Sequence, residues 1–326
     1  MNPPKNMSQL TVVICTHNPK EEFIQETLAA LRAQTAPLDA WDLLVIDNAS
    51  TVPLDRRLDL SWHPGGRIIR EESLGTAHAR LRSLRELKTS PSSLILFVDD
   101  DNILAPDYIA QGLALEKAWP QLGCWGGQLV ARYETEPPEW LENYKKYFAI
   151  LPLDAPLWTN RIHSYDMVPP TAGCFVRRAV WEKYLQLVAD SPLRLTLGAR
   201  GQEQARGEDT DLILSAIDIG LGVGRFPQLS AEHIMPAGRI TVAYLENLIA
   251  GVFFGTGVLE FIRQGKIPRP VGKHWLDRQL IRRRARRLPA PISNFYQAEL
   301  RGREKARALV LDWQTQPPSA SERRAV

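Results

Sequence analysis

The sequence predicts an α/β protein with a mostly parallel central sheet flanked by helices, and two observations lead to this prediction. Between residues 10 and 98, short apolar runs alternate with amphipathic helical patterns, the order typical of parallel strands joined by right-handed crossovers. The apolar runs also end in polar residues, and ligands of such sheets bind beyond the carboxyl ends of the strands. The chain of 326 residues, 44% hydrophobic and 24% charged, has an ordinary globular composition.

The predicted elements follow one another along the first third of the chain. A helix is predicted over 21–34, because Phe23, Ile24, Leu28 and Leu31 recur at the spacing of one buried helical face. Strands are predicted over 10–15, 42–47, 67–71 and 94–98, and further helices over 77–87 and from Pro106 to Trp119. Beyond these, the paired glycines 126 and 127 indicate a bulge or a close approach of two backbones.

The chain changes character beyond about residue 240, where it becomes helical and increasingly basic. We therefore predict an α/β domain over 1–240 that carries the functional site, and a basic helical extension over 241–326. The longest apolar stretch, 248–259, is too short to span a bilayer. The three cysteines are far apart in the sequence and predict no disulfide framework, so a cytoplasmic setting is expected.

Three consecutive aspartates, Asp99, Asp100 and Asp101, follow the buried strand in the stretch "LILFVDDDNIL". Like charges packed together raise one another's pKa and oppose folding unless a cation or several donors compensate them. One explanation is a ligand site at the strand end. The alternative is a solvated turn in which Asp101 or Asn102 caps the next helix.

Two familiar phosphate-binding loops are absent from the sequence. No G-x-G-x-x-G follows the first strand, and no G-x-x-x-x-G-K-[ST] occurs anywhere. These absences argue against dinucleotide oxidoreduction and P-loop hydrolysis. If phosphate is bound, its charge must be met by a divalent cation on the aspartates, and hard oxygen ligands suit Mg²⁺ or Mn²⁺.

Six motifs together resemble the family 2 glycosyltransferases, inverting enzymes with a GT-A fold that use nucleotide-diphosphate sugars. The motifs occur in the family's order and approximate spacing between residues 10 and 235. They are "TVVICTHN", "LLVIDNAS", "LGTAHAR", "LFVDDDN", "TAGCFVRR" and "GEDTDL". The resemblance implies a transferase of the EC 2.4 class that uses a donor, expected to be UDP-linked, to build a glycan or glycolipid.

The resemblance also implies roles for residues that bind the nucleotide sugar. Asp47 would hydrogen-bond the base, with Thr16 and Asn18 lining the same pocket, although short polar side chains at these two positions also suit loop capping. Arg80 would lie near the base and diphosphate, with a surface arginine as the alternative. Asp100 is assigned to the donor. Gly173 would let the donor sugar and the acceptor lie against the backbone, or would simply form a tight turn.

The catalytic and metal-binding groups are implied in the same way. Asp99 and Asp101 form the family's D-x-D, in which Asp101 binds the metal and Asp99 holds ribose or metal. Inverting transfer needs one base to take the acceptor's proton. Asp209 matches that base, and Glu208 would contact the acceptor or orient the loop. A helix-dipole charge is the alternative for Asp209. His233 would complete the metal or diphosphate site.

Two other functions stay open at this stage. A sugar-phosphate nucleotidyltransferase also combines an α/β sheet with metal-binding aspartates, but it would need a glycine-rich basic loop where "CTHNPKEEF" has no glycine. A catalytically inactive nucleotide-sugar-binding partner would not need Asp99, Asp101 and Asp209 intact.

The segment 263–288 suggests where the protein works. It carries many arginines and lysines against one acidic residue, Asp277, and follows an apolar, glycine-containing stretch. Apolar surface beside a basic cluster is typical of a helix lying on an anionic membrane. We therefore expect peripheral contact with the inner face of the membrane and no nucleic-acid partner. The alternative is a core helix of the extension with a basic face that is solvated or that binds nucleic acid.

Overall fold

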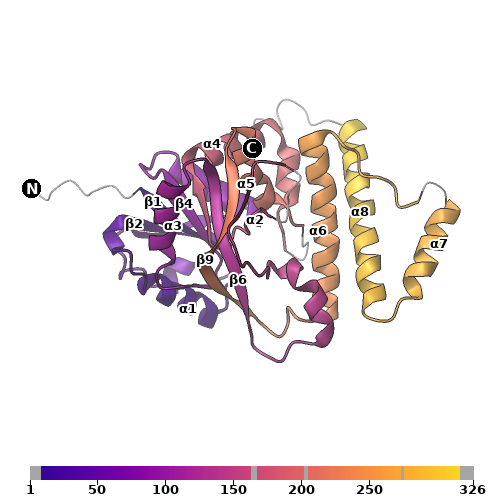
Figure 1. Ribbon diagram of the computed structural model, residues 1–326, viewed down its shortest axis with the longest axis horizontal. Coiled ribbons are helices and arrows are strands. Elements are labelled where there is room, and N and C mark those ends of the chain that lie inside the picture. The colour runs from indigo at the N-terminus through magenta and orange to yellow at the C-terminus, as the bar shows by residue number, and fades with distance from the viewer. Residues whose placement is uncertain (1–8, 163–166, 202–204, 273–274, 316–326) are drawn as a thin grey trace, which may run out of the picture. The chain divides into compact units, whose positions relative to one another are not determined.

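Figure 1 shows the computed structural model, which describes residues 9–162, 167–201, 205–272 and 275–315. The chain divides into two compact units. The first consists of Met1–Arg132, Ala149–Gln186 and Asp209–Ile234, and the second consists of Tyr133–Phe148, Leu187–Glu208 and Met235–Val326. The predicted division into 1–240 and 241–326 stays a prediction.

Four parallel strands form one half of the sheet, as the sequence predicted. Their order is β3-β2-β1-β4, so β2 and β3 lie on one side of β1 and β4 lies on the other. The strands are β1 (Leu10–Thr16), β2 (Trp41–Asn48), β3 (Gly66–Glu71) and β4 (Leu94–Val98). The cores of β1, β2 and β4 are buried, which explains their lack of polar alternation.

The other half of the sheet continues through five further strands in the described residues. The full order is β3-β2-β1-β4-β8-β6-β9-β5, with β7 paired to β9. The pairs β4–β8, β6–β8, β5–β9 and β7–β9 are antiparallel. These strands are β5 (Asn102–Leu104), β6 (Leu122–Tyr133), β7 (Leu157–Thr159), β8 (Cys174–Arg177) and β9 (Gly222–Met235).

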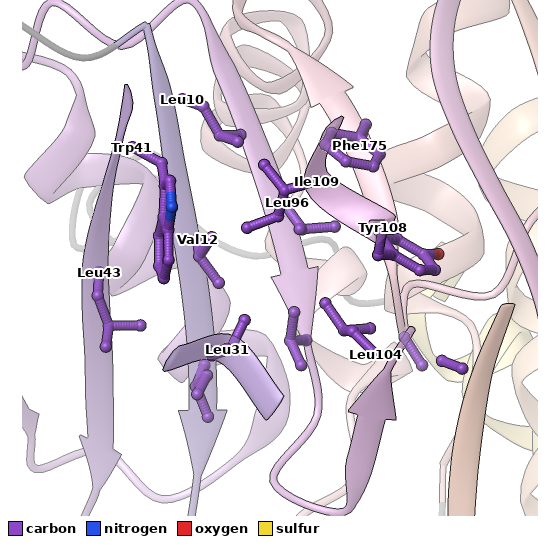
Figure 2. Packing of buried hydrophobic residues seen from close by; sticks show 14 of the residues in the cluster. Leu10, Val12, Leu31, Trp41, Leu43, Leu96, Leu104, Tyr108, Ile109 and Phe175 are labelled. Carbon is purple, nitrogen blue, oxygen red and sulfur yellow. The ribbon is translucent and has the colours of Figure 1, made fainter. Parts of the chain in front are cut away.

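Helices cover both faces of the sheet. The first-unit helices are α1 (Glu21–Arg32), α2 (Thr76–Leu87), α3 (Tyr108–Ala118), most of α4 (Arg178–Asp190) and most of α5 (Glu208–Asp218), with short 3₁₀ turns η1 (Leu38–Ala40) and η2 (Leu54–Arg56). Figure 2 shows part of one buried cluster, which includes Leu31 of α1, Tyr108 and Ile109 of α3, and Val12, Trp41 and Leu96 of the strands. The predicted buried face of α1 is confirmed.

The paired glycines of β6 lie at a close backbone approach, one of the two predicted explanations. A Cβ added to Gly127 would stand 1.5 Å from the carbonyl oxygen of Leu229 in β9. Gly126 has more room, since its nearest neighbour would be the Cβ of Pro169 at 3.0 Å. Gly127 therefore sets how closely β6 and β9 can pack.

The second unit is helical. It contains η3 (Glu139–Phe148), η5 (Pro192–Leu197), α6 (Val242–Gln264), α7 (Trp275–Arg286) and α8 (Ile292–Thr315). α8 contacts both α6 and α7, and Figure 1 shows α8 between the other two. Glu246 of α6 accepts hydrogen bonds from Asn294 at 2.7 Å and Arg301 at 3.3 Å, both on α8.

α6 extends well beyond the apolar stretch 248–259. By length and composition it is the one helix in the described residues that could cross a membrane, with a mean hydropathy of 1.5 in its most apolar window. In this structure its buried side chains include Leu245, Leu248, Val258 and Leu259, and its neighbours are α8, η5 and η3. α6 therefore contributes buried side chains to the packing of the second unit.

We expect Gly127→Ala to destabilise the protein by about 3 kcal/mol, because β6 and β9 must move apart to admit the methyl group. Thermal melting followed by circular dichroism would measure the loss. Gly238→Ala is the matched control, since a Cβ at Gly238 would meet nothing within 4 Å. Equal melting temperatures for the two variants would contradict the close approach of the strands.

Candidate active site

The carboxyl ends of β1, β2 and β4 lie next to one another because of their register. Thr16 pairs with Asp47 across β1 and β2, and Ile14 pairs with Val98 across β1 and β4. Continuing that register by two residues brings Asp100 beside Thr16, and the Thr16 hydroxyl donates a hydrogen bond to the Asp100 carboxylate. The predicted convergence of polar strand ends is therefore present.

The three aspartates form a tight turn held by Asn102. The Asp99 N–H donates to Asn102 Oδ1 at 3.2 Å, the Asn102 N–H donates to the Asp99 carbonyl at 3.2 Å, and Asn102 Nδ2 donates to Asp101 Oδ1 at 3.2 Å. Asn102 then begins β5, whereas α3 begins at Tyr108. The alternative in which this turn caps a following helix is therefore wrong.

β9 brings His233 to the aspartate turn. Asn102 pairs with His233 in the antiparallel register of β5 and β9, and the Ile234 N–H donates to the Asp101 carbonyl at 2.9 Å. As a result, His233 Nε2 lies 3.7 Å from Asp101 Oδ1, with the two side chains 12% and 5% exposed. This separation is too long for a hydrogen bond.

The pair of Asp101 and His233 fits a divalent cation. Ligands of a small divalent ion lie about 2.1 Å from it, so two ligands of one ion are at most about 4.2 Å apart, and the observed 3.7 Å falls within that limit. In the described part of the chain, no three acidic, histidine or cysteine side chains gather as a metal-binding group. Such an ion would complete its shell with water and substrate phosphate, as Mg²⁺ commonly does.

Asp47 is buried and holds the loop that follows β2. Its carboxylate accepts hydrogen bonds from the backbone N–H groups of Ser50 and Leu54, each at 3.0 Å, and from Arg70 Nη1 at 2.9 Å. The Ser50 side chain also hydrogen-bonds this carboxylate. A carboxylate offers about four acceptor positions. A nucleotide base could therefore bind Asp47 only by replacing one of these donors.

These donors also set the protonation of Asp47. Burial raises the pKa of its carboxyl group, but the hydrogen bonds from Ser50, Leu54 and Arg70 outweigh burial and hold the pKa below its usual 3.8. Asp47 is therefore ionised at neutral pH. It pairs directly with Arg70 in the register of β2 and β3, and Arg70 is a residue that the sequence analysis missed.

Asn18 and Asn48 hold the loops around these strand ends through hydrogen bonds. The Asn18 N–H donates to Ser50 Oγ at 2.9 Å, and Asn18 Oδ1 accepts from the Thr51 N–H at 2.8 Å. Asn48 accepts from the Gly75 N–H at 2.8 Å and donates to the Ser73 carbonyl at 2.7 Å, which fixes the loop before α2. The loop-capping role considered for Asn18 is thus present in the structure, and its contact with a nucleotide stays a prediction.

Arg80 of α2 is buried, 7% exposed, so the surface-arginine alternative is wrong. Its guanidinium lies over the ring of Phe97, 5.0 Å from the centroid. Phe97 stands near the end of β4, two residues before Asp99. The arrangement is a cation–π contact that holds a permanent positive charge close to the strand that ends in three aspartates.

Gly173 has an internal reason to be glycine. Its φ is +79°, a conformation that side chains other than glycine rarely adopt. A Cβ there would stand 2.3 Å from the hydroxyl of Tyr108, which donates to the Gly173 carbonyl at 2.6 Å. Burial raises the pKa of the Tyr108 phenol, so it stays a donor. The turn alternative is present, and a contact of Gly173 with sugar stays a prediction.

Asp209 and Glu208 lie in the first turn of α5. Asp209 is half-buried, and its Oδ1 accepts from the Thr210 N–H at 2.7 Å and from the Thr210 hydroxyl at 3.4 Å. Both bonds fall on one oxygen, an arrangement compatible with proton transfer at the other. Glu208 is buried, and the boundary between the two units falls between it and Asp209.

The structure therefore joins most of the predicted site. Described contacts link Thr16 to Asp100, Asp101 to His233, Asn18 and Asp47 to the loop after β2, and Gly173 to the Phe97 carbonyl at 2.8 Å. The closeness of Arg80, Glu208 and Asp209 to the aspartate turn stays a prediction. The missed Arg70 could have been found only by aligning the ends of two neighbouring strands.

Comparison with protein families gives one match. The family model described as "Glycosyl transferase family 2" matches residues 11–175, which hold the strand ends, the aspartate turn and Gly173. His233, Glu208 and Asp209 lie beyond the matched residues. A search of curated proteins finds no significant match.

Comparison with solved structures gives distant similarities. The chain is 12% identical to residues 1–349 of TarS from S. aureus in complex with UDP-GlcNAc, with a TM-score of 0.50, and the match covers 94% of this chain and 92% of that one. GalNAc-T7, solved with UDP, GalNAc and Mn²⁺, is 14% identical with a TM-score of 0.49, and the match covers 84% and 54% of the two chains. At this identity the likeness to TarS concerns the fold alone.

We expect Asp47→Asn to destabilise the protein by about 3 kcal/mol at pH 7, because it leaves Arg70 and two backbone donors facing a neutral amide. The loss should depend on pH. Since the folded-state pKa of Asp47 lies below 3.8, its stabilisation is complete above that value and is lost as the pH falls through the folded-state pKa. The melting temperatures of wild type and variant should therefore converge in acid, and a constant gap from pH 7 to 3 would contradict the argument.

Proposed function

Because the chain belongs to glycosyl transferase family 2, we propose that it transfers a sugar from a UDP-linked donor to a hydroxyl group of a glycan or glycolipid acceptor, with inversion at the anomeric carbon. The enzyme class is EC 2.4. The observation that carries the proposal is the pair of Asp101 and His233 beside the Thr16–Asp100 hydrogen bond. The UDP-GlcNAc bound to TarS, a protein of similar fold, supports a UDP-linked donor.

The two alternative functions lose support. Membership of the family favours sugar transfer over nucleotide transfer. An inactive binding partner is also disfavoured, because the aspartate turn is closely organised by Asn102 and His233 rather than left as a solvated loop. A donor-hydrolysis assay would distinguish an inactive partner from the proposed enzyme directly.

Asp101 and His233 would hold a divalent cation, Mn²⁺ or Mg²⁺, with Asp99 as a further ligand or as a partner of the ribose. When bound, such a cation stabilises the negative charge of the departing diphosphate. On the protein side, Asn102 orients the Asp101 carboxylate through its 3.2 Å hydrogen bond. Thr16 orients Asp100, which we assign to the donor.

The nucleotide would lie over the ends of β1 and β2. Asn18 and Asp47 shape this region through the loop at Ser50, and the buried Arg80 supplies positive charge next to Phe97. Gly173 would contribute backbone surface to the sugar. These assignments account for donor binding without a glycine-rich phosphate loop.

Asp209 would act as the general base. In the transfer, the acceptor oxygen forms a bond to the anomeric carbon while the bond from that carbon to the diphosphate oxygen breaks. The acceptor proton passes to the Asp209 carboxylate, and the nucleoside diphosphate leaves with the bonding electrons. Glu208, next in the chain, would contact the acceptor or orient the turn before α5.

Asp101→Ala should abolish transfer and remove the Mn²⁺-dependent part of UDP binding, because it deletes one of the two proposed cation ligands. UDP binding would be measured by thermal shift with and without Mn²⁺, since a ligand of the folded state raises the melting temperature. Asp154→Ala, at an exposed position, is the control and should behave as wild type. Undiminished transfer in the variant, or in excess EDTA, would refute the metal-dependent mechanism.

Asp209→Asn should leave donor binding close to wild type while it lowers kcat by about 10²–10⁴-fold, the usual contribution of a general base. Steady-state kinetics at saturating donor would measure the change. Asp218→Asn, at the exposed end of the same helix, is the control. Near-normal turnover of the Asp209 variant would assign the base to another residue, and Glu208 and Asp211 would be substituted next.

A further inference from the structure

Helix α7 carries the most exposed large apolar side chains of the described residues. Leu276 is 65% exposed and Leu280 is 55% exposed. Large apolar side chains on either side of α7 are also exposed: Ile267 by 41%, Leu288 by 40% and Ile292 by 43%. Single exposed apolar residues are common on protein surfaces, but a gathering of them in one short stretch marks an interaction surface.

The same stretch is the most basic part of the chain. Residues 263–288 contain ten arginines and lysines and one acidic residue, Asp277. Arg283, Arg284, Arg286 and Arg287 are all exposed. An ordinary solvated surface would mix both signs of charge. The excess of positive charge in this stretch is therefore complementary to a negatively charged partner.

Helical geometry aligns the leucines with the arginines. Leu276 and Leu280 are one turn apart on one face of α7, and Arg283 and Arg284 follow on the next turn of that face. α8 contacts α7, yet both leucines stay exposed. The face is therefore apolar in its first half and cationic in its second.

We propose that α7 and its flanks, residues 267–272 and 275–292, bind the surface of a bilayer that contains anionic phospholipid. Leu276 and Leu280 enter the boundary of the acyl chains, and the arginines lie among the phosphate groups. The positive charge favours an anionic headgroup. The exposed leucines favour a bilayer over a nucleic acid, because contacts with the phosphates of a nucleic acid would not require two exposed leucines side by side.

The proposal is tested by co-sedimentation of the full chain with vesicles of phosphatidylcholine, with and without phosphatidylglycerol. We expect wild type to sediment with the anionic vesicles at low salt, to stay in solution with the neutral ones, and to dissociate at about 1 M salt, where charges are screened beyond about 3 Å. Wild type that stays in solution with anionic vesicles at low salt would overturn the proposal.

Substitutions separate the charge contribution from the apolar one. Replacement of Arg283, Arg284, Arg286 and Arg287 by Gln should lower the vesicle partition coefficient about a hundredfold or more. The control replaces four exposed basic residues of the first unit, Arg56, Arg67, Lys88 and Lys117, by Gln, which gives the same net charge. If that control lowers the partition coefficient as much, binding follows net charge alone and the proposal fails.

Leu276→Ser with Leu280→Ser should lower the partition coefficient about tenfold, while the control Ile219→Ser with Leu311→Ser, at positions 37% and 38% exposed, should leave it unchanged. Melting temperatures within about 2 °C of wild type would show that the variants are folded. An unchanged partition coefficient of the leucine variant would overturn the proposed contact of Leu276 and Leu280 with the acyl chains.

Binding of wild type to a random-sequence DNA duplex but not to anionic vesicles would identify the face as a nucleic-acid surface instead. These measurements do not use transferase activity, so their failure would leave the proposed function untouched.

Discussion

The parallel register of β1, β2 and β4 is the constraint on which the candidate site depends. Because Thr16 pairs with Asp47 and Ile14 with Val98, three strand ends with polar residues meet at one edge. The apolar cores of these strands are buried on both faces, and a one-residue slip would exchange the two faces of a strand. The free energy of burying the core therefore also fixes the positions of Thr16, Asp47 and the aspartate turn.

Negative charge at this edge is balanced in two different ways. Asp47 is neutralised within the protein by Arg70 and backbone donors, so it acts as a structural anion that organises loops. The turn of Asp99, Asp100 and Asp101 is instead held through Asn102 and Thr16, and Asp101 lies across from His233 at more than hydrogen-bond distance. For this second arrangement we propose a divalent cation as the partner of the carboxylates, with the diphosphate of the donor bound to that cation.

The second unit combines a packed helical core with an exposed basic helix. α6 buries its apolar side chains beside α8, and Glu246 is fastened by Asn294 and Arg301. α7 is different, since Leu276 and Leu280 are exposed, and the exposed Arg283 and Arg284 follow them on the same face. An exposed apolar surface next to concentrated positive charge suits the boundary of an anionic bilayer, the partner that we propose for α7.

The sequence by itself determined the alternation of strands and helices up to residue 98, the buried face of α1 and the run of aspartates at the end of β4, because hydrophobic periodicity and strand ends are local properties. It also determined the family through short motifs in order. Only the tertiary structure decided that β9 returns to bring His233 to Asp101, that Arg70 neutralises Asp47, that Arg80 is buried on Phe97 and that Gly127 sits against β9. Each of these depends on the pairing of segments far apart in the chain, and the free energy that selects such a pairing comes from burying many side chains together rather than from any one local pattern.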